Sequence, residues 1–297
     1  MKRSISLALG GGGSKGNAHI GVLRVVEEMG YTISAIAGTS IGGLIAAVYV
    51  AGNSPDQMQA LLSETEFRKL FRGARRSRKS LLGLAGVADL LTETIGDTQF
   101  EDLRLPLALT AVDLKTGQEV VLNTGSVKEA VFATIAVPGI FPPREISDRE
   151  LVDGGISNPV PVELARSLAP RDPVIAVPLS SSPATNKILP ETNVLGPVPG
   201  IERMTHFRLG QAFQVFTRSM TISSRLLTDL RLQLEQPDLI IRPDVDHIGL
   251  LDRVDVAEVV RLGEEAARAA LPHLPHRRAW WQRLRPSFLN LRQPETN

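Results

Sequence analysis

The first 52 residues alternate twice between a short apolar run, a glycine-rich turn and a helical pattern. The two apolar runs end in the glycine-rich residues 10–13 and 38–43, and apolar residues then recur at helical spacing over residues 15–29 and 44–51. This order of elements favours a parallel sheet with helices packed against it. Both glycine turns follow strands, so we expect both at the carboxyl ends of the strands, where open α/β sheets bind their ligands.

The remaining chain continues the alternation of short strands and helices. Strand-like runs at residues 105–114 and 118–122 flank a Lys-Thr-Gly turn, which is typical of a hairpin. We expect further strands at residues 150–152, 174–179 and 239–242, helices at residues 55–71, 81–95, 128–136, 161–168, 204–234 and 254–270, and a loop at residues 180–200. Because no repeat or linker divides this pattern, it predicts one α/β domain over residues 1–271 and a separate tail over residues 272–297.

The composition excludes several classes of protein and site. The formal net charge is +1, so the chain has no overall attraction to nucleic acid. The absence of cysteine excludes disulfides, thiolate catalysis and cysteine-ligated metals, and it is compatible with a reducing cytoplasm. No stretch of about 18 apolar residues is present, so we expect no helix that spans a bilayer. The basic start, Met1-Lys2-Arg3, resembles a signal peptide, but the apolar run after it is too short, and we expect a first strand there.

Residues 38–42 match the nucleophile elbow, Gly-x-Ser-x-Gly, between a strand and a helix. In such an elbow Ser40 would sit on a sharp, strained turn, and Gly38 and Gly42 would let the chain pass closely on either side. The serine hydroxyl would then project at the top of the sheet, above the partly positive N-terminus of the next helix. An ordinary glycine-rich turn with a serine N-cap is the alternative interpretation of the same five residues.

Residues 11–16, Gly-Gly-Gly-Ser-Lys-Gly, follow one strand and precede a helix, and three interpretations compete for them. A dinucleotide fingerprint would want an acidic residue at the end of the second strand, where this chain has its second glycine turn instead. A Walker A loop needs Ser or Thr after its lysine, but Gly16 follows Lys15. The third interpretation is an oxyanion hole, in which developing negative charge is bound by the backbone N–H groups of Gly11, Gly12 and Gly13.

A serine nucleophile needs a base, and the sequence offers five histidines and one distinctive aspartate. His206 and His247 fall late in the chain, where an α/β-hydrolase carries its histidine, but neither lies in a distinctive motif, and His19 is interpreted as structural. Asp153 ends a short strand and is followed by two glycines. Its carboxylate could accept the serine proton if the fold brings it within hydrogen-bond reach. A type I′ hairpin turn is the alternative, because Asp-Gly favours such turns.

Together and in this order, the three motifs resemble those of the patatin-like phospholipase family, and most closely its bacterial single-domain members. The motifs are Gly-Gly-Gly-x-Lys-Gly after a strand, Gly-Thr-Ser-x-Gly, and Asp-Gly-Gly. Two further stretches are similar to the family: Ala-His-Ile-Gly-Val-Leu at residues 18–23 and Ala-Val-Pro-Gly-Ile-Phe-Pro-Pro at residues 136–143. The resemblance covers residues 4–180 with specific motifs.

The resemblance implies a three-layer α/β/α fold with a mainly parallel central sheet, formed by a patatin-like phospholipase domain over residues 1–271. It implies a catalytic dyad in which Ser40 is the nucleophile and Asp153 is the base, and an oxyanion hole formed by Gly11, Gly12 and Gly13. Lys15 falls where the family carries a basic residue, and we expect it to order this loop or to contact a lipid phosphate. The glycines that support these motifs are Gly16, Gly38, Gly42, Gly154 and Gly155.

The activity that the resemblance implies is release of fatty acids from phospholipids or lysophospholipids through an acyl-serine intermediate, without a metal or other cofactor. An acyltransferase with the same dyad is one alternative, and a lipid-binding regulatory protein with little turnover is another. Lipid is therefore the expected partner and nucleic acid is not. No feature of the sequence indicates an oligomeric state.

The predicted tail combines arginines with the only two tryptophans of the chain, which favours contact with a membrane interface. This segment runs from Arg277 through Trp280 and Trp281 to Leu291. Docking of the tryptophans on the protein's own core is an equally supported interpretation. A basic stretch at residues 68–79 would meet anionic lipid headgroups or form a solvated surface. We expect a cytoplasmic protein with peripheral membrane contact through the tail.

Overall fold

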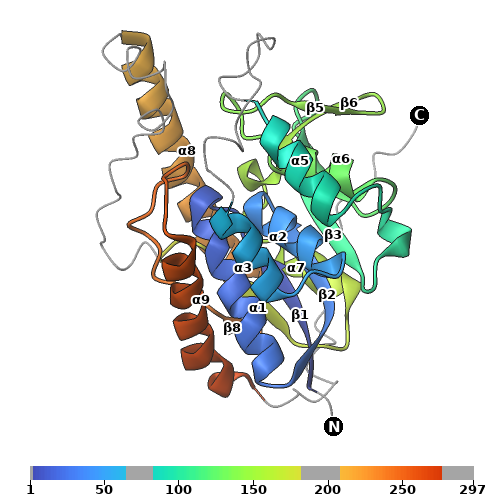
Figure 1. Cartoon of the computed structure of the whole chain (residues 1–297). Helices are drawn as coiled ribbons and strands as arrows, with labels where there is room; N and C mark the ends of the chain where they lie inside the picture. The colour runs from blue at the N-terminus through green and yellow to red at the C-terminus, as the bar shows by residue number, and fades with distance from the viewer. Residues whose placement is uncertain (1–2, 65–82, 182–207, 276–297) are drawn as a thin grey trace, which may run out of the picture.

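The computed structural model describes residues 3–64, 83–181 and 208–275, and it places their strands in one mixed sheet (Figure 1). The sheet has eight strands in the order β5-β6-β3-β2-β1-β7-β8, and β4 pairs with β3 off this path. The strands are β1 (Arg3–Leu9), β2 (Tyr31–Thr39), β3 (Leu107–Asp113), β4 (Glu119–Leu122), β5 (Arg144–Ile146), β6 (Arg149–Asp153), β7 (Val174–Val177) and β8 (Leu239–Ile240).

The centre of the sheet is parallel and one of its ends is antiparallel. Strands β3, β2, β1, β7 and β8 pair in parallel, whereas β4 and β6 pair with β3, and β5 with β6, in antiparallel fashion. All residues of β3 and β7 are buried, as expected for strands covered on both faces. The predicted α/β fold with a mainly parallel central sheet is confirmed.

Helices cover both faces of the sheet and produce three layers (Figure 1). The helices are α1 (Ala18–Glu28), α2 (Ile41–Val50), α3 (Pro55–Glu64), α5 (Ala85–Thr94), α6 (Val127–Thr134), α7 (Val162–Leu168), α8 (Arg208–Glu235) and α9 (Val256–Ala270), with short 3-10 helices η1 (Gly13–Asn17), η3 (Phe100–Asp102), η4 (Gly154–Ile156) and η6 (Leu271–His273). Side chains of β1 alternate between the two faces, since Leu7 and Leu9 join the larger core cluster with α1 and α2, while Ala8 joins a second cluster with α7 and α8.

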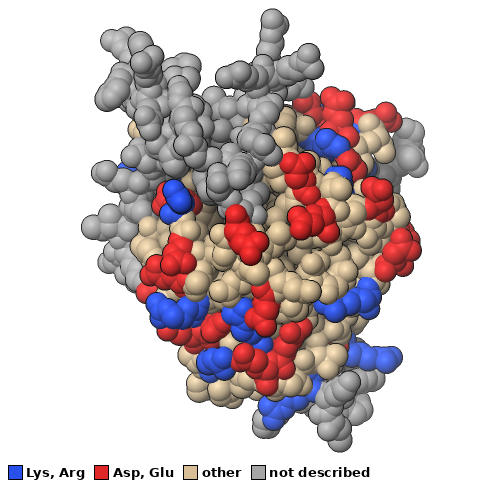
Figure 2. All heavy atoms as spheres, viewed as in Figure 1, with Lys and Arg blue, Asp and Glu red and all other residues tan. Residues whose placement is uncertain are grey.

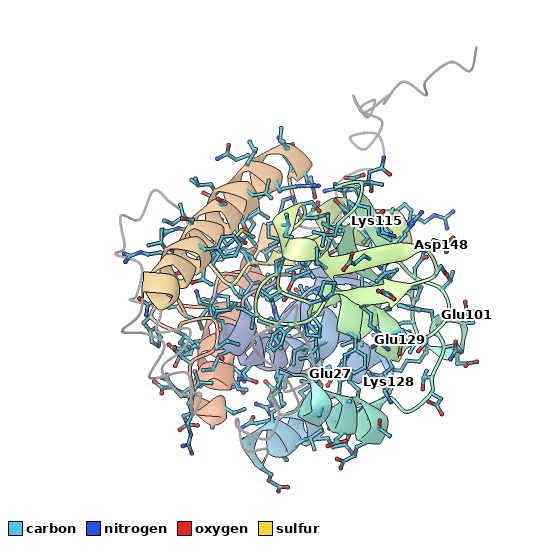
Figure 3. The ribbon with its side chains drawn as sticks, turned by 90° about the horizontal axis from the view of Figure 1, so that it is seen from above. Glu27, Glu101, Lys115, Lys128, Glu129 and Asp148 are labelled. Atoms are coloured by element: carbon cyan, nitrogen blue, oxygen red, sulfur yellow. The ribbon has the colours of Figure 1, made fainter. Side chains whose placement is uncertain are left out.

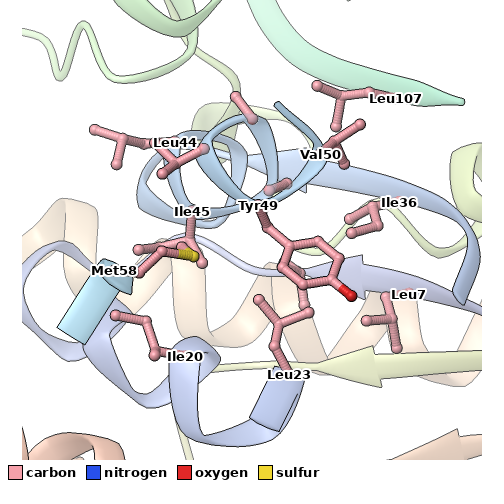
Figure 4. Close-up of a cluster of buried hydrophobic side chains, with 14 of the residues drawn as sticks. Leu7, Ile20, Leu23, Ile36, Leu44, Ile45, Tyr49, Val50, Met58 and Leu107 are labelled. Atoms are coloured by element: carbon pink, nitrogen blue, oxygen red, sulfur yellow. The ribbon is translucent and has the colours of Figure 1, made fainter. Parts of the chain in front are cut away.

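The two cores differ in the size of their side chains. The larger cluster interleaves leucines and isoleucines of β1, β2, α1 and α2, among them Leu7, Leu23, Ile36 and Ile45 (Figure 4). The strands contribute mainly alanines to the second cluster, including Ala8 and Ala176. These small side chains let α7 pack close to the sheet.

Two glycines bring α1 and α9 into backbone contact. A Cβ atom at Gly21 would lie 2.0 Å from the carbonyl oxygen of Val260, and one at Gly263 would lie 2.0 Å from that of Ala18. Arg24 of α1 forms ion pairs with Asp56 and Glu264 over this contact. Figure 2 shows acidic and basic side chains interspersed on the face that these helices present. The Asp56 side chain is exposed, so its pair contributes little, whereas the Arg24–Glu264 pair is half-buried and links α1 to α9 beside the close backbone contact.

Two hairpins lie together at the antiparallel end of the sheet. The predicted Lys-Thr-Gly turn joins β3 to β4, and the structure confirms this hairpin. The predicted strand near residue 150 is β6, which pairs with β5 to form a second hairpin. The sequence analysis did not predict β5. Lys115 Nζ, from the first turn, donates a hydrogen bond of 3.1 Å to the carbonyl of Asp148 in the second (Figure 3).

Several predicted elements fall wholly or partly outside the described residues. They are the basic stretch at residues 68–79, the loop at residues 180–200 from residue 182 onward, the Arg277–Leu291 region of the tail, and parts of the predicted helices at residues 55–71, 81–95 and 204–234. Residues 272–275 of the predicted tail are described. Among them, η6 continues to His273, and Leu274 packs against the main core cluster. Within the described ranges, no helix has both the length and the apolar composition that crossing a bilayer requires.

We expect Gly263→Ala to destabilise the protein, although alanine favours a helix more than glycine does. The higher helix propensity of alanine stabilises by about 1 kcal/mol, whereas overpacking against a backbone carbonyl costs up to about 3 kcal/mol. The expected net loss is about 2 kcal/mol in the free energy of unfolding, measured by urea unfolding. Glu265→Ala, on the exposed side of the same helix, is the control and should change stability by less than about 0.5 kcal/mol. A stabilised Gly263→Ala protein would contradict the contact between α1 and α9.

Candidate active site

Ser40 occupies a strained turn between β2 and α2. Its φ of 55° and ψ of −128° lie outside the regions that non-glycine residues ordinarily adopt. The turn is held at the end of β1, since a Cβ atom at Gly42 would lie 2.3 Å from the carbonyl oxygen of Leu9. Strain of this kind persists only where the surrounding structure fixes it, and it is concentrated at functional sites.

The Ser40 hydroxyl donates a hydrogen bond to Asp153. The Oγ to Oδ2 distance is 2.5 Å, and both residues are buried, with 8% and 5% of their surface exposed. The sheet register brings them together, because Thr39 at the end of β2 pairs with Thr110 of β3, and Asp153 at the end of β6 pairs with Ala111 beside it. The Asp-Gly pair does not form the alternative hairpin turn, since η4 follows directly after Asp153.

Burial makes the Asp153 carboxylate a better proton acceptor. Loss of hydration raises the pKa of Asp153 to about 6, although hydrogen bonds from Ser40 and from the Gly155 N–H act in the opposite direction. The Gly155 N–H lies 2.7 Å from Oδ1, so each carboxylate oxygen has its own donor. A carboxylate held against a serine hydroxyl in this way can take the hydroxyl proton as a nucleophilic attack begins.

Three threonines support the turn, and no motif in the sequence distinguishes them from other threonines. Thr134, the fully buried last residue of α6, accepts a hydrogen bond of 2.9 Å from the Ser40 N–H. Thr39 and Thr110 share a hydrogen bond of 2.7 Å beneath the turn, and Thr39 also donates to the Asn158 carbonyl at 2.8 Å. These bonds satisfy the buried polar groups at the end of β2 and hold the Ser40 backbone in its strained conformation.

The glycine loop lies directly beside Ser40, but its donors differ from the prediction. A Cβ atom at Gly11 would lie 3.2 Å from the Ser40 Cβ, so the two backbones are close neighbours. The Gly11 N–H, however, donates to the Pro159 carbonyl at 3.0 Å and is therefore not free to bind an oxyanion. Within the described residues, the N–H groups of Gly12 and Gly13 have no acceptor and remain available. Of the three N–H groups expected to bind an oxyanion, only those of Gly12 and Gly13 could therefore do so.

The supporting glycines of the motifs lie at close contacts around the same site. Hypothetical Cβ atoms would meet Ile41 from Gly16, Gly43 from Gly38, the Leu9 and Gly10 carbonyls from Gly42, Thr110 from Gly154 and the Asp153 carboxylate from Gly155. These neighbours all belong to β1, the Ser40 turn, β3 or the Asp153 segment. The spacing of the glycines in the sequence therefore reflects one shared packing requirement.

The histidines do not supply a base for Ser40 among the described residues. His19 is fully buried, its Nε2 is 2.8 Å from the Gly10 carbonyl oxygen, and burial lowers its pKa to about 4. At neutral pH the Nε2–H of neutral His19 can only donate to that carbonyl, which anchors the glycine loop. His247 is exposed on the surface, and His206 lies outside the described residues. The structural interpretation of His19 agrees with these contacts.

Lys15 lies near the charged side chains of Asp246 and Arg225. Burial lowers the pKa of Lys15, whereas the carboxylate of Asp246 raises it and the guanidinium of Arg225 lowers it further. Asp246 accepts a hydrogen bond of 2.9 Å from the Ser181 N–H, and Arg225 donates to the Ser181 carbonyl at 3.1 Å. These groups lie more than 150 residues after Lys15 in the chain, so local spacing could not reveal them.

Ser40 lines two cavities. The larger has a volume of about 370 Å³ and runs between α2, α3, α5 and the segment before α9. The smaller, of about 160 Å³, lies against α8 and includes Lys15 and Asp153. Ser40, Val137 and Leu250 line both cavities and therefore mark their junction. Over the described ranges, no group of three acidic, histidine or cysteine side chains is placed to hold a metal ion.

Comparison with known proteins gives a family whose motifs coincide with this site. A family model described as patatin-like phospholipase matches residues 7–166. The matched span includes the glycine loop, Ser40 and Asp153, together with β1, β2, β3 and β6 that position them.

Individual relatives match over different lengths. An uncharacterised NTE family protein of Mycobacterium tuberculosis is 35% identical over 183 residues, which are 61% of this chain and 50% of that protein. Another uncharacterised NTE family protein of the same organism is 31% identical over 281 residues, covering 92% of this chain and 47% of that protein. The chain therefore spans about half the length of these curated relatives. The structure of VipD from Legionella pneumophila superposes with a TM-score of 0.52 at 10% identity, over 92% of this chain and 67% of VipD, which supports the fold alone.

The raised pKa of Asp153 predicts a pH-dependent effect of Asp153→Asn on stability. A pKa of about 6, against an ordinary value of 3.8, means that the folded chain binds this proton more tightly than the unfolded chain. The resulting stabilisation is fully present below about pH 4 and is lost as the pH rises through about 6. Asparagine cannot ionise, so the stability of the variant relative to the parent should increase by up to about 3 kcal/mol between about pH 4 and about pH 7. Urea unfolding across this range measures the difference, and a difference independent of pH would contradict the burial of an ionised carboxylate.

Proposed function

The chain belongs to the patatin-like phospholipase family, and from this premise we propose that it is a serine hydrolase that releases fatty acids from phospholipids or lysophospholipids. The observation that carries the proposal is the hydrogen bond of 2.5 Å between the Ser40 Oγ and the Asp153 Oδ2. A serine on a strained turn, with a buried carboxylate as its partner, is an activated nucleophile without a histidine.

In the first step of the proposed reaction, the Ser40 Oγ attacks the carbonyl carbon of the ester while Asp153 accepts the hydroxyl proton. A bond forms between Oγ and the carbonyl carbon, and the carbonyl oxygen takes up negative charge. Collapse of this intermediate breaks the bond to the alcohol. The alcohol leaves with the proton returned by Asp153, and the acyl group stays on Ser40.

In the second step, water attacks the acyl group on Ser40. Asp153 accepts a proton from the water, a second tetrahedral intermediate forms, and the bond to the Ser40 Oγ breaks. The proton passes to the serine oxygen, and the fatty acid is released. The same carboxylate therefore acts in both steps, and neither step requires a metal.

Backbone donors and Lys15 complete the proposed site. We assign the oxyanion to the N–H groups of Gly12 and Gly13, which have no acceptor within the described residues. One such donor is worth roughly 10²–10³ in rate. Lys15 lines the smaller cavity beside Ser40, and we propose that it orders the glycine loop or contacts a substrate phosphate.

Two other functions would use the same residues. An acyltransferase would form the same acyl-Ser40 but pass the acyl group to an alcohol or a thiol instead of water. A regulatory lipid-binding protein would bind acyl chains with little turnover, and the intact Ser40–Asp153 contact argues against it. Product analysis separates them, because only hydrolysis consumes water and releases free fatty acid in the absence of an added acceptor.

Substitution of either dyad residue should abolish most ester hydrolysis. We expect Ser40→Ala to remove labelling by a fluorophosphonate probe together with the activity, and Asp153→Asn to lower kcat by about 10²–10⁴. In the parent protein kcat/KM should increase with pH through an apparent pKa of about 6, as Asp153 becomes ionised. Ser167→Ala, at an exposed serine of α7, is the control and should behave as the parent. Unchanged hydrolysis by Ser40→Ala would refute the proposed nucleophile.

We also propose that residues 277–291, from Arg277 to Leu291, give the protein peripheral contact with membranes. Arginines beside Trp280 and Trp281 suit an interface that is anionic on one side and apolar on the other. Flotation with liposomes that contain anionic lipid should recover the full chain but less of a chain ending at Pro275. This endpoint retains Leu271 and Leu274, which pack against the core. Equal flotation of both proteins would exclude the tail as the anchor.

A further inference from the structure

Residues 157–159, which follow η4, form hydrogen bonds with each part of the candidate site, and we call them the connecting segment. The Asn158 carbonyl accepts a hydrogen bond of 2.8 Å from the hydroxyl of Thr39, the residue before the proposed nucleophile. The Asn158 N–H donates at 2.8 Å to the carbonyl of Gly154, the residue after the proposed base. The last carbonyl of the segment accepts the Gly11 N–H of the glycine loop at 3.0 Å. The connecting segment therefore sets the relative positions of the serine turn, the aspartate turn and the glycine loop.

Two charged side chains from distant elements hold the connecting segment. Arg231 of α8 donates a hydrogen bond of 2.9 Å to the Ser157 carbonyl. Glu119 of β4 accepts one of 2.8 Å from the side-chain amide of Asn158. Asn158 is only 3% exposed, and its Oδ1 has no hydrogen-bond partner among the described residues. The contact with Glu119 is therefore the one that orients this side chain within the described part of the chain.

The same two side chains also pair with each other. The Arg231 guanidinium lies 3.3 Å from one carboxylate oxygen of Glu119, whose other oxygen binds Asn158. Each side chain of the pair is 28% exposed, so solvent screens the pair less than it screens fully exposed charges. Arg231 also donates to Glu235 on its own helix at 2.8 Å. Because a guanidinium presents its donors in a rigid planar fork, these contacts fix Arg231 and the groups bound to it in one arrangement.

We propose that Arg231 and Glu119 are positioning residues for the reaction at Ser40. The proposal rests on the proposed function and adds two residues that act on it through the connecting segment. Neither residue lines the two cavities at Ser40, so neither is placed to bind substrate. Catalytic groups must be held to within about 0.5 Å of their productive geometry, and a displacement of about 1 Å can lower the rate by about 10²-fold. Loss of either side chain should therefore lower kcat and leave KM nearly unchanged.

Arg166 of α7 provides a matched control for the loss of an arginine. Its side chain is 30% exposed, against 28% for Arg231. Like Arg231, it binds carboxylate and backbone carbonyl groups, and its partners are Glu163 and the carbonyls of residues 235 and 236 at the end of α8. None of these partners belongs to the connecting segment. Arg166→Met therefore removes similar contacts of α8 without removing a bond to the segment.

The experiment measures hydrolysis of p-nitrophenyl butyrate and urea unfolding for the full chain and its variants. We expect Arg231→Met to lower kcat by about tenfold or more and to leave KM within about twofold of the parent. Arg231→Lys should lower kcat by less, because its ammonium keeps the charge and can reach one of the acceptors, although it lacks the planar fork. Arg166→Met should lower the urea midpoint about as much as Arg231→Met does but keep kcat within about twofold of the parent.

A double variant tests whether the two residues act together. Glu119→Gln keeps an acceptor for the Asn158 amide and removes the charge that pairs with Arg231. We expect this variant to lower kcat by less than Arg231→Met does. The combination of both changes should lower kcat no further than Arg231→Met alone, because members of one network are not additive. If Arg231→Met does not fold, Glu119→Gln and Arg231→Lys, compared with Arg166→Met, decide the proposal in the same way.

Several outcomes would overturn the proposal. An unchanged kcat in Arg231→Met would do so, as would equal losses of kcat in Arg231→Met and Arg166→Met, which would indicate a role in stability alone. A raised KM with unchanged kcat would also overturn it, because that pattern marks a binding role. The proposed function is tested separately by Ser40→Ala. If that variant hydrolyses the ester as the parent does, or if the parent does not hydrolyse it, the proposed function fails whatever the Arg231 variants show.

Discussion

The close approach of the Ser40 turn to the end of β1 is the contact on which the site depends. Gly42 lies so near the Leu9 and Gly10 carbonyl oxygens that a Cβ atom there would be 2.3 Å and 2.6 Å from them. This contact fixes the nucleophile turn and the glycine loop as one unit, because β1 runs directly into the loop. The Gly10 carbonyl also accepts a hydrogen bond from the buried Nε2 of His19, so a side chain of α1 anchors the glycine loop. Donors for an oxyanion and the serine that would create it are therefore positioned by the same few backbone atoms.

The buried Asp153 carboxylate and the strained Ser40 backbone both lower the stability of the fold, and both belong to the proposed reactive site. Ser40 adopts an unfavourable backbone conformation, which typically costs about 1–3 kcal/mol. Asp153 is kept in a buried position where its ionised form is disfavoured. The buried residues at the carboxyl ends of β1 and β2 and along β3 supply packing that offsets these costs.

Much of the fold and the principal site residues were predictable because their signals are local in sequence. The alternation of apolar runs and glycine turns predicted the parallel strands. The resemblance of the three motifs to a known family singled out Ser40 and Asp153, which the register of β2, β3 and β6 brings together. Contacts between residues that lie far apart in the sequence were not predictable. Gly11 was expected to bind an oxyanion, but its N–H is taken by Pro159, almost 150 residues away. Thr134 and Arg225 likewise act at the site from distant elements, and no local pattern distinguishes them from other threonines and arginines.

One physical cause would let an aspartate act as the proposed base where many serine hydrolases employ a histidine. Removal from water disfavours the charged form of any group, so it raises the pKa of an acid and lowers that of a base. Burial accordingly brings Asp153 to a pKa of about 6, near the ordinary histidine value of about 6.5, while it lowers His19 to about 4. A carboxylate in this environment has the proton affinity that general-base catalysis needs near neutral pH, and the histidine does not. Among the described residues Ser40 has no histidine partner, and the proposed reaction needs none, because burial in this fold raises the pKa of Asp153.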